Sequence, residues 1–228
     1  MDYRILGTTM PILECTLGLG ETILAQPGAM KYMDEGISMK TGVHGGIGGF
    51  LKRTVTGESG FMTTFEAIRD HQRLAFGHTF PGTILTLDVR ERDFVCQKRA
   101  FLACTPDVTF DIAIQRRLGS GFFGGEGFVM QRLGGNGTAF VELDGETVEL
   151  QLDPGQKVRV ETGAVAMFES TVDMNIETVK GLGNILFGGE GLFLTTLTGP
   201  GRVWLQTMSI QSLAGEIFPY LPKPGKSS

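Results

Sequence analysis

The sequence predicts an all-β fold in which three repeated β modules pack around an approximate threefold axis, followed by a short C-terminal helix. Three observations predict it: the chain has 34 glycines in 228 residues, apolar and polar residues alternate in short segments, and two motifs recur at constant spacing. Abundant glycine is typical of tight turns, and alternation with a period of two is typical of strands. Each module is too small to be comfortably stable alone, so we expect the three to pack on one another.

The first recurring motif places similar segments near both ends of the chain. Residues 153–169 match residues 18–34 at a constant offset of 135, and both segments contain a Gly-Ala pair. A weaker middle match at 92–104 has Arg99 and Ala100 in place of that pair. Such self-similarity is the signature of one structural unit used several times.

The second recurring motif keeps the register of the first. The pentapeptide FGGEG occurs at 123–127 and again at 187–191, and the step between these copies equals the step from Arg99 to Gly163 in the first motif. In the first copy the segment GESGF at 57–61 stands in this place, after a longer glycine-rich stretch. We interpret the pentapeptide chiefly as a tight turn that marks each module.

The motif spacing divides the chain into three β repeats and a tail. The predicted boundaries are 1–70, 71–135 and 136–208 for the repeats, and 209–228 for the C-terminal helix and tail. β modules of this kind leave sheet edges that must be covered, so we also expect homo-oligomerisation.

An Asp-Gly pair lies between two alternating segments within residues 138–152. In the second of these segments Val148, Leu150 and Leu152 occupy one face, and polar residues occupy the other. A two-residue Asp-Gly connection between such segments predicts a β-hairpin with one buried face.

Two further segments, 94–103 and 158–168, are also predicted to be strands. Residues 209–221 differ, because their apolar residues are spaced as one helical face before two prolines end the pattern. The sequence therefore places its only clear helix near the C-terminus.

Charge and cysteine content limit the partners and the compartment. A net charge of −5 opposes binding to nucleic acid or to an anionic membrane. Cys15, Cys96 and Cys104 are odd in number and lie among apolar neighbours, which favours buried thiols in a reducing compartment and hence the cytoplasm. No secretion signal and no apolar run approaching the roughly 20 residues of a membrane span is present, so we expect no membrane insertion.

Read in order, the short motifs of the chain resemble those of one known family. They are QPGAM, KRxxxGESGF, QKRAFLA, FGGEGF, VETGAV, FGGEGLFLTxLTGPG and VWLQT. The sequence resembles, over about residues 2–222, the conserved bacterial and archaeal family related to the mitochondrial biogenesis protein numbered 24 of the "altered inheritance of mitochondria" set.

The resemblance implies a triplicated β fold similar to that of the tryptophan RNA-binding attenuation protein, a short double-stranded β-helix. It implies no set of catalytic residues, since the prokaryotic members have no established biochemical activity. The eukaryotic member is associated with organisation of the mitochondrial inner membrane. Because this sequence shows no mitochondrial presequence, we do not expect that role here.

Basic residues precede the glycine segments and could form one anion site in each module. The residues of this candidate site are Lys52, Arg53, Gly57, Gly60, Arg116, Arg117, Gly124, Gly127, Lys180, Gly188 and Gly191. Backbone N–H groups in a glycine-rich turn, together with a cationic side chain, suit a phosphate or a carboxylate. A purely structural turn is the alternative, and Glu126 and Glu190 favour it by adding negative charge.

Other motifs give little support for catalysis or cofactor binding. Residues 119–124 fit the pattern GxGxxG, but the segment that follows is typical of a strand and lacks the helix that a dinucleotide site needs. The chain has no Walker loop, no nucleophile elbow and no histidine at metal-ligand spacing. We therefore expect no cofactor and no metal.

The histidines allow one acid–base hypothesis. His71 and His78 could form a catalytic group with Glu66 and Asp70, although the segment also fits an ordinary polar loop. His44 lies in the glycine-rich stretch and has no evident partner.

RNA binding rests only on analogy with the resembled fold. Binding of single strands would need a basic groove with stacking aromatic residues. The glycine-flanked phenylalanines are instead expected to pack in the core; they are Phe122, Phe123, Phe128, Phe187 and Phe193.

The leading functional hypothesis is a non-enzymatic binding or assembly protein that presents its β modules to a protein partner or a small anionic ligand. The alternative is an enzyme, or a nucleotide- or RNA-binding protein, with a site at a module junction. A polar junction pocket holding Arg, His and carboxylate groups would favour the alternative, and solid apolar packing would favour the leading hypothesis.

Overall fold

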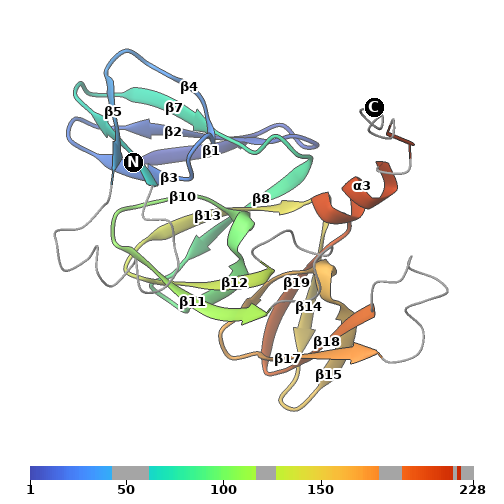
Figure 1. Cartoon of the computed structure of the whole chain (residues 1–228). Helices are drawn as coiled ribbons and strands as arrows, with labels where there is room; N and C mark the ends of the chain where they lie inside the picture. Colours follow the sequence, from blue (N-terminus) through green and yellow to red (C-terminus); the bar gives the residue numbers. More distant parts are fainter. Residues whose placement is uncertain (43–61, 117–126, 180–191, 218–219, 222–228) are drawn as a thin grey trace.

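The computed structural model of the chain describes residues 1–42, 62–116, 127–179, 192–217 and 220–221 (Figure 1). Within these residues the fold is almost entirely β, with antiparallel strands in four sheets and one short α-helix, α3 (Ile210–Ile217). The predicted all-β class and the predicted C-terminal helix are confirmed.

The first two sheets contain most of the N-terminal half of the chain. The first sheet has the strand order β1 (Asp2–Leu6), β2 (Ile12–Leu17), β7 (Gln72–Phe76) and β4 (Met30–Met33). The second sheet has the strand order β5 (Ile37–Gly42), β6 (Met62–Ala67), β3 (Thr22–Ala25), β10 (Phe101–Cys104), β13 (Thr138–Asp144) and β8 (Gly82–Asp88).

The other two sheets contain most of the C-terminal half. The third sheet has the strand order β11 (Val108–Arg116), β12 (Phe128–Gly135), β9 (Phe94–Gln97), β16 (Val165–Glu169), β19 (Gly201–Gln206) and β14 (Thr147–Leu152). The fourth sheet has the strand order β15 (Lys157–Glu161), β18 (Leu192–Thr198) and β17 (Asp173–Val179).

Three hydrophobic clusters hold the sheets together in series. The first cluster joins the first and second sheets and includes Phe65 and Phe76, whose ring centroids are 5.2 Å apart. The second joins the second and third sheets and includes Phe101 and Trp204. The third joins the third and fourth sheets around Phe128. Each cluster buries the apolar faces of two neighbouring sheets, which is the main source of their stability.

Two of the phenylalanines expected in the core lie in described residues, and both pack there. Phe128 is 1% exposed, and Phe193 is partly buried against the same cluster. Phe122, Phe123 and Phe187 lie outside the described residues.

The segment 138–152 does not form the predicted hairpin. β13 pairs with β8 and β10 in the second sheet, whereas β14 pairs with β19 in the third. Gly145 has the positive φ of +73° that the Asp-Gly turn requires, but its N–H donates to the carbonyl of Pro81. The turn connects two sheets because each arm satisfies its backbone groups with strands from elsewhere in the chain. Val148, on the face predicted to be buried, is 46% exposed.

The predicted strands at 94–103 and 158–168 are present, but a 3-10 helix interrupts each one. These helices are η1 (Lys98–Ala100) and η3 (Thr162–Ala164), and each lies where the chain crosses from one sheet to another. Within the part of the chain that is described, no helix is long and apolar enough to cross a lipid bilayer.

Candidate functional site

The candidate anion site at the glycine segments lies mostly outside the described residues. Those outside are Lys52, Arg53, Gly57, Gly60, Arg117, Gly124, Lys180, Gly188 and Gly191, and the 119–124 motif lies there too. Arg116 is the exposed last residue of β11 and is paired in register with Phe128, and Gly127 has a φ of +76°. The site therefore stays a prediction from the sequence.

The structure has a pocket of about 300 Å³ where the chain crosses between the first, second and third sheets. Segments far apart in the sequence build it: the β3–β4 turn, the β7–β8 connection, η1 and the first residue of α3. The lining residues are Gln26, Pro27, Gly28, Ala29, Gly77, His78, Thr79, Phe80, Arg99 and Ile210. This volume is at the lower end of the range for small-molecule sites.

Backbone hydrogen bonds fix the wall formed by the β3–β4 turn. The N–H of Gln26 donates to Leu102 at 3.0 Å, and the N–H of Ala29 donates back to Gln26 at 3.2 Å. Gly28 closes this turn with a φ of +81°, a conformation that favours glycine. The N–H of Gly77 then donates to Ala29 at 3.0 Å, which attaches the β7–β8 connection to the same wall.

His78 lines the pocket and carries one polar atom without a partner. Its Nε2 is sealed from solvent and has no hydrogen-bond partner among the described residues. Burial, together with the nearby charges of Arg99 and Lys31, lowers the pKa of His78. The imidazole is therefore neutral near pH 7.

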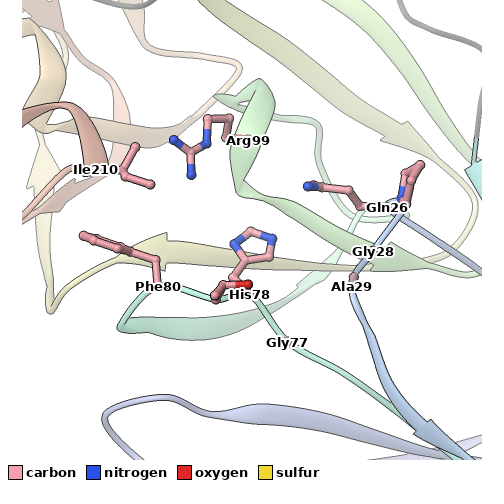
Figure 2. Close-up of a pocket in the computed structure, with 10 residues that line it drawn as sticks. Gln26, Gly28, Ala29, Gly77, His78, Phe80, Arg99 and Ile210 are labelled. Carbon is pink, nitrogen blue, oxygen red and sulfur yellow. The ribbon is translucent and has the colours of Figure 1, made fainter. Parts of the chain in front are cut away.

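Arg99 supplies a cation on the opposite wall. Figure 2 shows its guanidinium and the His78 ring facing one another, with Phe80 and Ile210 on one side and Gln26 on the other. Among the described residues, no carboxylate lies within ion-pair distance of the Arg99 guanidinium. Its charge acts on Asp144, where it opposes the rise in pKa that burial causes.

Two carboxyl groups lie behind the His78 wall. Oε2 of Glu142 accepts a hydrogen bond from the backbone N–H of His78 at 2.9 Å, whereas its buried Oε1 has no partner in the described part of the chain. Burial raises the pKa of the Glu142 carboxyl to about 7. Burial also raises the pKa of Asp144, whose Oδ2 accepts a hydrogen bond from the N–H of Ile210 at 3.2 Å. These groups hold the connection before β8 and the start of α3 in place.

A second buried carboxylate serves a structural role. Glu169 forms ion pairs of 2.6 Å with Arg92 and 2.7 Å with Arg202, and these partners hold its pKa below the usual value despite its burial. Arg202 also lies over the Trp204 ring, 5.0 Å from its centroid. These groups are satisfied by one another and offer nothing to a ligand.

The residues of the acid–base group predicted from the sequence do not lie together in one site. His71 is exposed in the β6–β7 turn and pairs with Asp70 at 3.3 Å, and Glu66 pairs with Lys40 at 3.3 Å. His78 lines the pocket instead. His44 lies outside the described residues.

The three cysteines are buried thiols and form no disulfide with one another. Burial raises the pKa of the Cys15 thiol to about 12, which makes it a poor nucleophile at neutral pH. Within the described residues, no cluster of three or more His, Cys, Asp or Glu side chains could hold a metal ion.

Sequence reasoning missed the junction pocket, although one signal was present. Arg99 stands in the middle copy of the first motif where the other copies have Gly28 and Gly163. The change from glycine to a long cation at one of three related positions marks the wall of the pocket. No comparable signal marks His78 or Glu142, because only the tertiary fold brings them together.

Comparisons with known proteins identify the family and the fold. Residues 3–208 match the family described as Mitochondrial biogenesis AIM24. An uncharacterized protein of Streptococcus pyogenes serotype M6 is 28% identical over 222 residues, which cover 93% of this chain and 87% of that protein. The X-ray structure of Streptococcus pyogenes protein SPYM3_0169 superposes with a TM-score of 0.78 at 24% identity, covering 96% of this chain and 99% of that one. The chain therefore belongs to the Mitochondrial biogenesis AIM24 family.

Proposed function

We propose that this protein binds a small organic anion in the junction pocket. One observation carries the proposal: Arg99, whose guanidinium has no ion-pair partner within the described residues, and His78, whose Nε2 has no hydrogen-bond partner there, line the same pocket. A buried polar atom without a partner is costly, and a ligand that hydrogen-bonds it removes that cost. A polar pocket lined by Arg99 and His78, with Glu142 beside it, favours the alternative hypothesis of a site at a module junction over solid apolar packing.

The chemistry of the lining defines the ligand class. Arg99 suits a carboxylate or a phosphate, both of which accept paired hydrogen bonds from a guanidinium. The neutral His78 suits an uncharged polar group, and Phe80 and Ile210 form an apolar wall. The ligand is therefore a compact molecule with one anionic group and an apolar body.

Titration calorimetry with three ring compounds tests this function. Benzoate and phenyl phosphate supply the two kinds of anion, and benzamide is the neutral counterpart of benzoate. We expect benzoate or phenyl phosphate to bind more tightly than benzamide. Arg99→Gln should weaken binding of the anion about tenfold or more, as expected for loss of a charge-assisted hydrogen bond.

Arg90→Gln is the matched control, because Arg90 pairs with Asp88 at 2.5 Å and does not line the pocket. This variant should bind the anions as the parent protein does. Failure of both anions to bind at millimolar concentration, or equal binding by the parent and Arg99→Gln, would refute the proposal.

We also propose that the all-β fold consists of three copies of one six-stranded unit, joined in series rather than closed around an axis. Its first support is the position of the β-bulges. The register of β4, β10 and β16 against their partner strands shifts after Met30, Phe101 and Val165. The number of residues from Met30 to Phe101 equals that from Gly28 to Arg99, which are the first and middle copies of the first sequence motif. The number from Phe101 to Val165 equals that from Arg99 to Gly163, the middle and last copies.

The turn that follows each of these strands gives a second support. A backbone carbonyl accepts from the N–H three residues later in the pairs Asp34 and Ile37, Thr105 and Val108, and Glu169 and Val172. The side chain of the first residue also accepts from a backbone N–H of the partner strand, in the pairs Asp34 and Arg73, Thr105 and Thr138, and Glu169 and Arg202. Independent structures would not be expected to share both interactions at matched positions.

The strand pairings suggest units at 12–76, 82–144 and 147–206, because β7 and β13 pair with strands that precede them. Each unit begins 11 residues after the repeat inferred from the sequence, and the third ends two residues before it. Three buried thiols support our proposal of a reducing compartment, the cytoplasm.

A further inference from the structure

One strand pairing joins each proposed unit to the next, so the chain contains two such pairings. β3 pairs with β10, with Ala25 opposite Ala103, and β9 pairs with β16, with Cys96 opposite Met167. The two pairings are equivalent. Ala25 precedes Cys96 by the step between the first and middle motif copies, and Ala103 precedes Met167 by the step between the middle and last copies. The same strand pairing, in the same register, therefore occurs twice within the chain.

Among the described strands that correspond to β3, β9, β10 and β16, β4 and β15 are the two that pair with no strand of a neighbouring unit. β4 has the place of β10 and β16 in the first unit, and β15 has the place of β3 and β9 in the third. Within the sheets described, each of them pairs on one side only, with β7 and β18 respectively. Figure 1 shows β4 and β15 at opposite ends of the molecule, so they do not meet within one chain.

Burial distinguishes these two edges from their equivalents. Every residue of β10 and β16 is buried, whereas three of the four residues of β4 are exposed. β15 alternates between exposed and half-buried residues, whereas β3 and β9 are each buried at three of four positions. The exposed residues of β4 include Tyr32 and Met33, each 37% exposed. Large apolar side chains on an unpaired edge are typical of an interaction surface.

The backbone of β4 is oriented to accept another strand. The N–H of Asp34 donates to the carbonyl of Arg73 in β7 at 2.8 Å. Because successive residues of a strand direct their N–H and C=O groups to opposite sides, those of Met33 point to the free edge. If β4 and β15 of two copies pair in the register that β10 has with β3 and β16 has with β9, Met33 lies opposite Arg159 and Tyr32 lies opposite Val160.

The charges along the two free edges are complementary in this register. Lys31 lies opposite Glu161 at one end of the paired segment, and Glu35 lies opposite Lys157 at the other. Opposite charges in directly facing positions stabilise an antiparallel pair, and like charges destabilise it. The register that the internal contacts dictate is thus also the one that the charges favour.

We propose that copies of this chain associate head to tail, with β4 of one copy pairing antiparallel to β15 of the next. The occupant of each free edge is a second copy, because the other two edges of this kind are filled by the same chain's own strands. Such an interface is heterologous, so repetition closes a ring or extends a filament. The inference rests on the proposed threefold repeat and is independent of the ligand pocket.

Two proline variants test this arrangement by size-exclusion chromatography with light scattering. Met33→Pro removes the outward N–H of β4, and Arg159→Pro removes the facing N–H of β15, at edge positions where proline is tolerated. We expect the parent protein to form concentration-dependent oligomers and each variant to be monomeric. An equimolar mixture of the variants should form a 1:1 dimer and nothing larger, because only one functional β4 and one functional β15 edge can meet.

A charge exchange tests the register without changing the backbone. Glu35 and Lys157 are exposed and belong to neither pocket nor core. Glu35→Lys and Lys157→Glu should each weaken association about two- to fivefold, and the double variant should restore it. Circular dichroism and thermal unfolding verify that every variant is folded.

Three outcomes would overturn the proposal. They are a parent protein that stays monomeric at sub-millimolar concentration, a folded proline variant that still self-associates, and a mixture of the variants that stays monomeric. If a proline variant fails to fold, the charge exchange decides: a double variant no better than the single ones contradicts the pairing.

Discussion

Individual residues around the pocket carry polar groups that the fold alone does not require. Arg99 replaces a glycine at one of three related positions, and His78 and Glu142 each keep one buried polar atom without a partner among the described residues. The two buried atoms cost stability in the empty protein, because desolvated polar groups lose their hydrogen bonds to water, whereas Arg99 is exposed. Function is a sufficient reason for retaining them.

Glu142 should make stability depend on pH. Its folded pKa of about 7 lies above the ordinary value of 4.5, so the native state binds the proton more tightly than the unfolded chain does. Its contribution is fully present below about pH 4.5 and is lost as the pH rises through 7. Glu142→Gln should therefore be more stable than the parent above pH 7, by up to about 3 kcal/mol, and the difference should shrink toward pH 4.5.

Urea unfolding of both proteins at several pH values measures this difference. Asp144 and His78 titrate in both proteins, so only the difference between the two curves reports on Glu142. Glu146→Gln is the matched control, because it removes a carboxylate from an exposed position close in sequence. Parallel curves for the parent and Glu142→Gln would show that the group does not have the raised pKa.

At the scale of elements, turns decide where each strand goes. At Asp144–Gly145 the chain bends, with the positive φ at Gly145 that glycine favours, yet the two arms belong to different sheets. Turn chemistry is local, whereas the partner of a strand depends on which apolar faces the whole chain must bury. Local pattern thus predicted the strands here but not their pairing.

Two glycines with positive φ should respond differently to substitution by alanine. Gly155 has a φ of +77° and nothing within 4 Å of an added Cβ, so Gly155→Ala should cost about 1 kcal/mol of backbone strain. Gly135 has a φ of +98°, and its added Cβ would lie 2.4 Å from the carbonyl oxygen of Asp107. Gly135→Ala should cost about 3 kcal/mol, since the backbone must move as well.

The difference in free energy of unfolding between the two variants is the quantity to measure by denaturant titration. Equal losses would mean that the contact with Asp107 relaxes freely and that positive φ alone sets the cost.

At the scale of the whole molecule, the pocket ties together elements from near both ends of the described chain, from the β3–β4 turn to α3. A bound anion stabilises the folded arrangement of all of them, by an amount that grows with ligand concentration. Benzoate should slow amide hydrogen exchange in the turn at Gln26–Ala29 and at the start of α3. β17 and β18 in the fourth sheet should be unchanged, because they do not contact the pocket.

Hydrogen exchange followed by mass spectrometry, with Arg99→Gln as the control, checks this coupling. Equal slowing throughout the chain would indicate general stabilisation by the salt, and no slowing at the turn would place the ligand elsewhere.

The sequence by itself determined the all-β class, the C-terminal helix and the family, because glycine turns, alternating residues and ordered motifs are local features. It also indicated the repeat spacing, which matches the bulges after Met30, Phe101 and Val165. Only the tertiary structure decided that β13 and β14 enter different sheets, and that Gln26, His78, Arg99 and Ile210 share one pocket. The physical reason is that a strand satisfies its hydrogen bonds and buries its apolar face with any partner of suitable register, so pairing is settled by the packing of the whole chain.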